Sequence, residues 1–409
     1  MKYFLLIFLL IPSFIFAQEN NEENQERKLS AFTVVSLQDA NLDWWTKVPP
    51  NTVFLQTPKK VYKGEKFICI SFTNSVTKSP NEAYKIKYTF SLTKENEEPK
   101  ILREEVLEGV QKIVEHMILL SLIGIVFEES DDFGNYVFTL NVENLLNGET
   151  ATSTYKLELA PWVSPATVDT VEKVNEVIQG FNHELNPDLL YSIFLSDKFT
   201  FYQRGHWHGI NPVGYSFFVN AFNKFDFLYE HLMKEENFEN QNSTNRQKII
   251  MLNSFAKRDA IDENILTRDE IAFQNYVRNE FNLDDNPYEN IEALQSLDLL
   301  WGEFFATGKY APVRRILDAL AFYEESLYAK DVLAKDTNAE SPEDKEKLIK
   351  GLIYFAAEKS IGSNVKNKLL LKYLQWADYN DLPIDLQFRL RSIFDKKVES
   401  FKKAGFPVK

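Results

Sequence analysis

The sequence predicts an N-terminal immunoglobulin-like β-sandwich followed by an all-α domain of antiparallel helical hairpins. Three observations carry this prediction. Apolar residues alternate with a period of two over about 53–159, and helical spacing replaces that pattern after Pro161. The second half also contains several pairs of an N-capping residue followed by proline. We therefore place the β-sandwich at 31–160 and the all-helical domain at 165–409.

The first 17 residues have the pattern of a secretory signal peptide. Lys2 supplies the positive start, an apolar run covers 3–16, and Ala17 stands at the expected cleavage position. This run is too short for an ordinary membrane-spanning helix, and a polar, mostly acidic stretch follows it. We expect a flexible leader at 18–30, no transmembrane segment after cleavage, and an exported protein that is periplasmic or secreted.

The net charge and the number of cysteines restrict which partners the protein can bind and which bonds can stabilise it. The formal net charge is −14, whereas a general nucleic-acid binder needs a basic surface. We therefore expect no nucleic-acid partner. The single Cys69 cannot form an internal disulfide, so the core has to stabilise this exported chain.

The first half reads as short strands joined by turns. In 84–92, YKIKYTFSL, the residues Tyr84, Ile86, Tyr88 and Phe90 share one face of the predicted strand. Asn147-Gly148 predicts a hairpin turn between two later strands. The apolar run at 110–127 is ambiguous, because a buried helix and buried strands look alike in such a run; we interpret it as two strands of the sandwich.

The second half is organised around 297–320, LDLLWGEFFATGKYAPVRRILDAL, which predicts a helix, a tight turn and a second helix. Gly308 suits the left-handed cap that ends the first helix, and Pro312 suits the first turn of the next. Further helices are expected at 343–360, 364–376 and 383–403. Helix starts are predicted at five pairs, namely Ser164-Pro165, Asn186-Pro187, Asn211-Pro212, Asn286-Pro287 and Ser341-Pro342.

One long motif resembles a known group of proteins. The segment LLWGEFFATGKYAPVRRI at 299–316, joined to the upstream DDFGNYVFTLNV at 131–142, is similar to exported bacterial proteins of unassigned function. Those proteins have a sandwich-like front half and a helical back half. The resemblance implies export and this architecture over most of the mature chain, and it implies no activity.

The best candidate site is QRGHWHGINP at 203–212. His206 and His208 are two residues apart, so both imidazoles point to the same side of an extended segment and suit one metal ion, with Zn²⁺ the usual choice. His183, Glu184 and His231 are the candidates for a third ligand. The alternative is a connecting loop in which Trp207 anchors into the core and the two histidines cap nearby carbonyls. A loop flanked by glycines also suits contact with a partner, through Arg204, Trp207 and Asn211.

Three functional hypotheses remain open from the sequence. The leading one is a non-enzymatic binding protein of the bacterial envelope, whose partner is an unknown protein or envelope component. The second is a metal-dependent hydrolase that uses His206 and His208. The third is a carrier of a small apolar ligand in the helical domain, suggested by the many aromatic residues between Phe217 and Tyr229. No catalytic or cofactor-binding residue is assigned beyond this zinc hypothesis.

Overall fold

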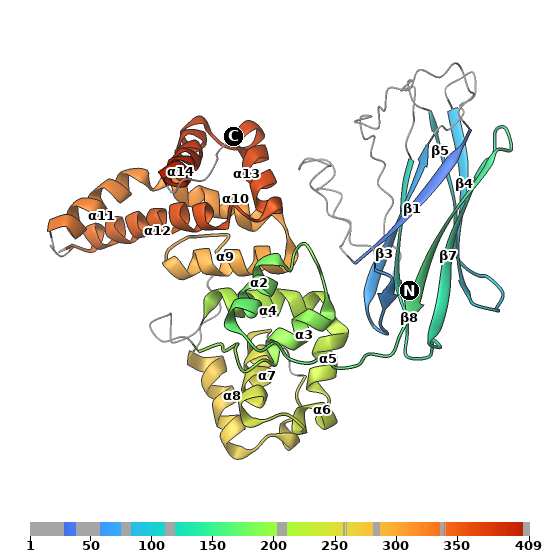
Figure 1. The fold of residues 1–409 in the computed structure, drawn as a ribbon, viewed down its shortest axis with the longest axis horizontal. Helices are drawn as coiled ribbons and strands as arrows, with labels where there is room; N and C mark the ends of the chain where they lie inside the picture. Colours follow the sequence, from blue (N-terminus) through green and yellow to red (C-terminus); the bar gives the residue numbers. More distant parts are fainter. Residues whose placement is uncertain are drawn as a thin grey trace. The chain divides into compact units, whose positions relative to one another are not determined.

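The computed structural model describes residues 28–37, 58–74, 83–110, 119–202, 211–256, 258, 260–280, 287–335, 339 and 341–403. Contacts divide the chain into two compact units, Met1–Val163 and Ser164–Lys409, which we call the strand unit and the helical unit. The described residues of the first are mainly in β-strands, and those of the second mainly in helices (Figure 1). The predicted combination of a β half and an α half is therefore confirmed.

The strand unit contains two sheets. Its strands are β1 (Ser30–Ser36), β2 (Lys60–Val61), β3 (Lys66–Asn74), β4 (Ala83–Lys94), β5 (Lys100–Val110), β6 (Leu119–Val126), β7 (Gly134–Asn144) and β8 (Thr150–Leu159). One sheet has the order β1-β3-β6, and the other has the order β2-β8-β7-β4-β5. Neighbouring strands are antiparallel, except that β2 and β8 run parallel.

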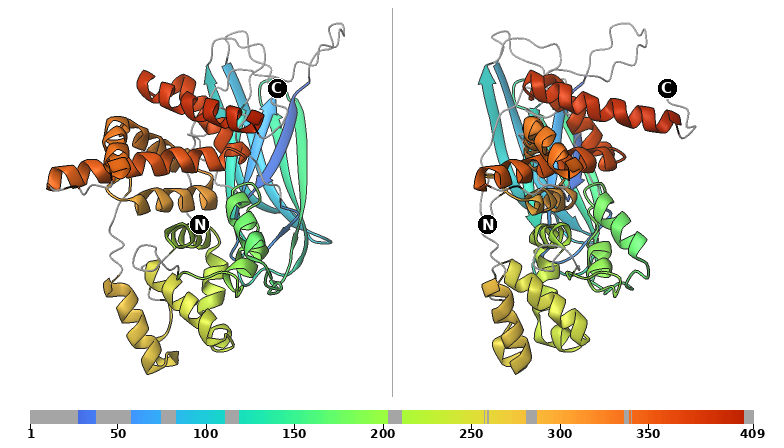
Figure 2. Two further views of the ribbon diagram at one scale, coloured as in Figure 1. Left: turned by 60° about the vertical axis from the view of Figure 1, so that its left-hand side comes forward. Right: turned by 90° about the vertical axis from the view of Figure 1, so that its left-hand side faces the viewer.

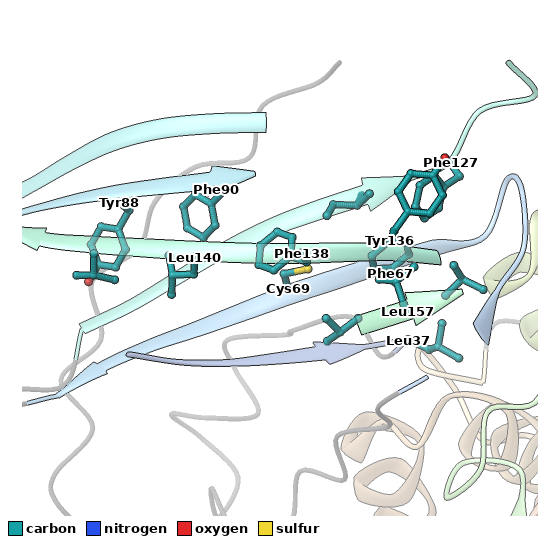
Figure 3. Close-up of a cluster of buried hydrophobic side chains, with 14 of the residues drawn as sticks. Leu37, Phe67, Cys69, Tyr88, Phe90, Phe127, Tyr136, Phe138, Leu140 and Leu157 are labelled. Atoms are coloured by element: carbon teal, nitrogen blue, oxygen red, sulfur yellow. The ribbon is translucent and has the colours of Figure 1, made fainter. Parts of the chain in front are cut away.

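A single apolar core is shared by the two sheets, because alternate residues of each strand point to the same face. Figure 3 shows Cys69 of β3 within this core, together with Phe90 and Phe138 from the five-stranded sheet. The rings of Phe90 and Phe138 have centroids 6.1 Å apart. Cys69 is a buried free thiol, and burial raises its pKa.

Several predictions about the strands are confirmed. Tyr84, Ile86, Tyr88 and Phe90 are all buried on one face of β4. The Asn147-Gly148 turn joins β7 to β8, and Gly148 has a left-handed φ of 78°. In the ambiguous run at 110–127, residues 119–126 form strand β6, so this part is a strand and not a buried helix. Residues 111–118 of that run lie outside the described residues.

The helical unit consists of helices of 5 to 23 residues and two short 3₁₀ turns within the described chain. The helices are α2 (Val171–Gly180), α3 (Pro187–Phe194), α4 (Pro212–Lys224), α5 (Asp226–Met233), α6 (Glu235–Glu239), α7 (Ser243–Phe255), α8 (Arg268–Glu280), α9 (Leu294–Thr307), α10 (Tyr310–Asp318), α11 (Tyr323–Lys335), α12 (Pro342–Asn364), α13 (Lys368–Asn380) and α14 (Ile384–Lys403). Figure 2 shows α11 and α12 side by side. None of the helices in the described ranges has the length and apolar character that a membrane crossing requires.

The predicted centre of the second half, 297–320, forms α9 and α10. Gly308 ends α9 with a φ of 65°, the left-handed conformation that glycine adopts most readily. Gly302 has a different role, because a Cβ at this position would lie 2.5 Å from the Val213 carbonyl oxygen of α4. The absence of a side chain at Gly302 therefore lets α9 and α4 pack closely.

The predicted helix starts have mixed outcomes. Asn186, Asn211 and Ser341 each cap a helix that begins with proline, as expected. The prediction at Ser164-Pro165 is wrong, because α2 begins at Val171 and Thr170 caps it. Ser164 instead contacts the Tyr191 hydroxyl, with the two oxygens 3.4 Å apart.

The predicted helix start at 286–287 is also wrong. Pro287 lies in a turn, and the next helix, α9, begins only at Leu294. A cation from α10 holds this turn, since Arg315 Nε donates a 3.0 Å hydrogen bond to the Pro287 carbonyl. The Pro287 carbonyl, which belongs to no helix, is thus hydrogen-bonded by a side chain of α10. Asn286 itself lies outside the described residues.

Candidate functional site

The proposed metal ligands His206 and His208 lie outside the described residues, as do Arg204 and Trp207. Asn211 is described, and its side chain accepts a 3.0 Å hydrogen bond from the Gly214 N–H, which caps α4. Its own backbone N–H donates a 2.8 Å hydrogen bond to the Phe201 carbonyl. A backbone hydrogen bond thus joins Phe201 to Asn211, and Asn211 has a structural role as a helix cap.

A buried lysine that no sequence motif predicts lies at the end of α3. Lys248 of α7 is buried, and its Nζ donates hydrogen bonds to the carbonyls of Phe194 (3.2 Å) and Ser196 (2.6 Å). Burial lowers the pKa of Lys248 to about 8, and the nearby Asp197 carboxylate opposes this change. The carbonyls belong to the end of α3, where a cation is favourable. Lys248 therefore stabilises the end of that helix.

The other histidines of this region have partners of their own. His183 Nε2 donates to Asn367 Oδ1 at 3.1 Å, and Asn237 Nδ2 lies 3.3 Å from His231 Nδ1. Burial is the main cause that lowers the pKa of both imidazoles. Glu184 is exposed. Among the residues that the structure describes, no three His, Cys, Asp or Glu side chains gather as a metal site would require.

The aromatic residues considered for an apolar ligand pack against one another. The ring centroids of Phe218 are 4.5 Å from Phe199, 5.2 Å from Phe194 and 5.0 Å from Phe217. Most of these pairs meet edge to face, which is a favoured geometry for aromatic side chains. The Phe-rich stretch of α4 therefore contributes to the core of the helical unit.

Three exposed apolar residues flank the turn that joins α13 to α14. They are Tyr379, Ile384 and Phe388, whose exposed fractions are 80 %, 60 % and 61 %, and we call them the α13–α14 surface. Ile384 and Phe388 are four residues apart, so they share one face of α14. The opposite face of α14 buries Leu386, Leu390 and Ile393. Packing within the helical unit accounts for the apolar residues on the buried face of α14. It does not account for Ile384 and Phe388 on the exposed face.

Polar contacts hold this surface in place. Arg391 of α14 contacts Asp378 of α13, with Nε 2.9 Å from Oδ1, so an ion pair joins the two helices. Asp381, in the turn between the helices, accepts a 2.6 Å hydrogen bond from the Tyr310 hydroxyl. Arg314 Nε lies 2.9 Å from the same Asp381 oxygen. The polar residues of the long motif at 299–316 thus anchor the turn that carries the surface.

The sequence matches no protein-family model and no curated protein. The solved structures that are similar to it at a low level include the following two. The first is a family 123 glycoside hydrolase from Clostridium perfringens, with 11 % identity over 52 % of this chain and 36 % of that chain, and a TM-score of 0.22. The second is native alpha-2-macroglobulin from Escherichia coli, from domain MG7 to the C-terminus, with 11 % identity over 82 % of this chain and 60 % of that chain, and a TM-score of 0.17. TM-scores this low carry no argument about fold or function.

Proposed function

We propose that the strand unit is an immunoglobulin-like sandwich. Such a sandwich has strands A, B, E and D in one sheet and strands G, F and C in the other, to which the variable type adds C′ and C″. The orders β1-β3-β6 and β8-β7-β4-β5 correspond to A-B-E and G-F-C-C′, and no strand of the described residues stands in the place of D. The short strand β2 adds in parallel beside β8. This strand order supports the proposal more strongly than the alternating sequence pattern does.

A side-chain contact gives independent support. Immunoglobulin-like domains carry a tyrosine near the start of strand F whose hydroxyl bonds to the backbone a few residues upstream. Tyr136 lies near the start of β7, the strand that corresponds to F, and its hydroxyl donates a 2.6 Å hydrogen bond to the Asp132 carbonyl. Cys69 of β3 would occupy strand B, so the sandwich would hold its sheets together without a disulfide.

For the whole chain, we propose an exported, non-enzymatic interaction protein of the bacterial envelope. The α13–α14 surface is the observation that carries this function. Two aromatic side chains and an isoleucine are exposed on the two helices that the ion pair of Arg391 with Asp378 joins. Tyrosine and arginine are enriched among the residues that dominate binding energy in protein interfaces. The signal-peptide pattern and the resemblance to exported two-domain proteins support the envelope as the location.

Site-specific photo-crosslinking in the producing bacterium tests this function. A photoreactive amino acid replaces Tyr379 in the full chain, and a matched control replaces Leu333 of α11, which has an exposed fraction of 61 %. We expect a discrete protein adduct at position 379 and none at 333. The adduct at 379 should weaken in a Phe388→Ser background and persist in a Leu333→Ser background. Identical adducts at both positions, or none at 379, would count against the proposal.

A further inference from the structure

A row of hydroxyl side chains crosses the inner face of the three-stranded sheet. Thr33 of β1 is paired in register with Ser71 of β3, which is paired with Ser121 of β6. All three side chains point inward, because each lies two positions from a residue of the shared core, namely Val35, Cys69 and Ile123. All three are buried, with exposed fractions of 5 % or less. The same face carries Phe67 and Cys69 toward its other end, where the core is apolar. The inner face of this sheet therefore changes from apolar to polar along the strands.

The five-stranded sheet adds polar groups at the same level. Tyr88 of β4 is fully buried, and it is paired in register with Glu105 of β5. Thr73, also fully buried, lies close enough to Tyr88 that its hydroxyl lowers the pKa of the phenol, while burial raises that pKa more strongly. Within the described residues, neither hydroxyl of this pair makes a hydrogen bond of good geometry. We call Thr33, Ser71, Thr73, Tyr88 and Ser121 the hydroxyl belt.

Both lateral edges of the belt are closed by polar contacts between the sheets. On one side, Ser153 Oγ of β8 accepts a 3.0 Å hydrogen bond from the Thr33 N–H. On the other, the Ser121 hydroxyl donates to Glu105, which also forms an ion pair with Arg103. Arg103 in turn donates a 3.2 Å hydrogen bond to the Leu122 carbonyl of β6. The belt is thus an enclosed layer with its polar groups held in place.

Among the residues that the structure describes, four oxygens of this layer find no hydrogen-bond partner of good geometry. They are Thr33 Oγ1, Ser71 Oγ, Thr73 Oγ1 and the Tyr88 hydroxyl oxygen. Buried polar groups in folded proteins are nearly always hydrogen-bonded, because leaving one unbonded retains its full desolvation cost. Four such groups at one level of a single core point to a shared bound partner.

We propose that the hydroxyl belt is a binding site for ordered water molecules that bridge the two sheets. Each hydroxyl both donates and accepts hydrogen bonds, and a buried water needs two to four such partners. Because the residues of the belt are buried, the bound ligand has to be small. A cation is disfavoured, since the carboxylate of Glu105 is already paired with Arg103. Around Phe67 and Phe138, packing of apolar side chains joins the two sheets. At the hydroxyl belt, bound water would join them instead.

Thermal unfolding of the mature full chain provides the first test. If water is bound to Ser71 and Thr73, the substitutions Ser71→Ala and Thr73→Val each remove a hydrogen bond and should lower the Tm by about 2–4 °C. Thr73→Ser keeps a hydroxyl and should recover most of the loss. Thr154→Val, on the exposed face of β8, is the matched control and should leave the Tm unchanged. A rise in Tm for Ser71→Ala would overturn the proposal, because it would show that the hydroxyl was buried without a bond.

Oxygen-17 relaxation dispersion provides the second test, since it detects water molecules that stay in a protein for longer than the protein tumbles. We expect a signal from long-lived water in the wild type and in Thr154→Val. This signal should be smaller in Ser71→Ala and in Thr73→Val. An unchanged signal in both belt variants would overturn the proposal, whatever their effect on Tm.

Discussion

The Tyr310 hydroxyl and the Arg314 guanidinium share one oxygen of Asp381, at 2.6 Å and 2.9 Å. Tyr310 and Arg314 belong to α10, whereas Asp381 lies in the turn between α13 and α14. This contact ties the most distinctive motif of the sequence to the turn that presents Tyr379 and Ile384. The motif therefore has a structural role that bears directly on the proposed interaction surface.

Asp381→Ala should loosen this turn. We expect a loss of about 1–2 kcal/mol in the free energy of unfolding, because two donors lose a partly buried charged acceptor. Urea denaturation of the full chain measures it. Asp331→Ala is the control, since its exposed pairing with Lys335 four residues later contributes little. Equal losses in the two variants would show that Asp381 has no special anchoring role.

Gly302→Ala should destabilise the helical unit. Its Cβ would lie 2.5 Å from the Val213 carbonyl oxygen and 2.7 Å from Ser216 Cβ, so α9 and α4 would have to move apart. Overpacking of this kind costs about 1–3 kcal/mol. Gly180→Ala in α2 meets no atom within 4 Å and should be neutral or slightly stabilising. Comparing the two denaturation midpoints checks the prediction, and a stable Gly302→Ala would contradict it.

Tyr136→Phe tests the proposed immunoglobulin-like corner. The substitution removes the hydroxyl that donates to the Asp132 carbonyl and leaves the buried ring in place. We expect the strand unit to lose about 1 kcal/mol of unfolding free energy, the usual net contribution of one such hydrogen bond. Tyr379→Phe, at an exposed position, should change nothing. Tyr136→Phe with wild-type stability would remove this support for the fold.

The pair Arg246–Glu270 should make stability depend on acid pH. Arg246 Nε and Nη2 donate hydrogen bonds of 2.6 Å and 2.7 Å to the two carboxylate oxygens of Glu270. This hydrogen-bonded cation is the main cause that lowers the pKa of Glu270 to about 2. In the unfolded chain, the Glu270 carboxylate takes up a proton near pH 4.5, whereas in the folded protein it does so only near pH 2. The stabilisation is therefore present above pH 4.5 and is lost as the pH falls toward 2. After allowance for solvent screening, we expect a contribution of about 1–2 kcal/mol.

Unfolding experiments between pH 2 and pH 6 measure this dependence. Glu270→Gln should lower stability at pH 6 and flatten the slope between pH 4.5 and pH 2. Glu346→Gln removes an exposed partner of Lys350 and should leave that slope nearly intact. A Glu270→Gln profile parallel to the wild type would show that the pair does not control acid unfolding.

Metal analysis of the mature chain, produced without a histidine tag, tests the alternative hypothesis at His206 and His208. The proposed interaction function predicts no stoichiometric zinc, and a His206→Ala, His208→Ala variant as stable as the wild type. Near-stoichiometric zinc that disappears in the double variant would favour the metal-dependent hydrolase instead. Adding a chelator to the wild type should leave its Tm unchanged under the interaction hypothesis.

Local signals in the sequence were sufficient for much of the fold. Gly308, Asn186 and the Asn147-Gly148 pair predicted their cap and turn positions, because the backbone conformation at each depends on residues within a few positions. The same reasoning failed at Ser164, whose side chain contacts Tyr191 and not the start of a helix. His206 and His208 remain a prediction from spacing alone.

The sequence by itself determined where strands give way to helices and where most of the predicted helices begin. Only the tertiary structure decided which distant polar groups meet. Lys248 reaches the carbonyl of Ser196, 52 residues away, and Thr33 comes into register with Ser71 and Ser121. Hydrophobic periodicity specifies which face of an element is buried, but the partner of each buried group depends on how the elements pack. The hydroxyl belt and the anchored α13–α14 surface are features that depend on how the elements pack.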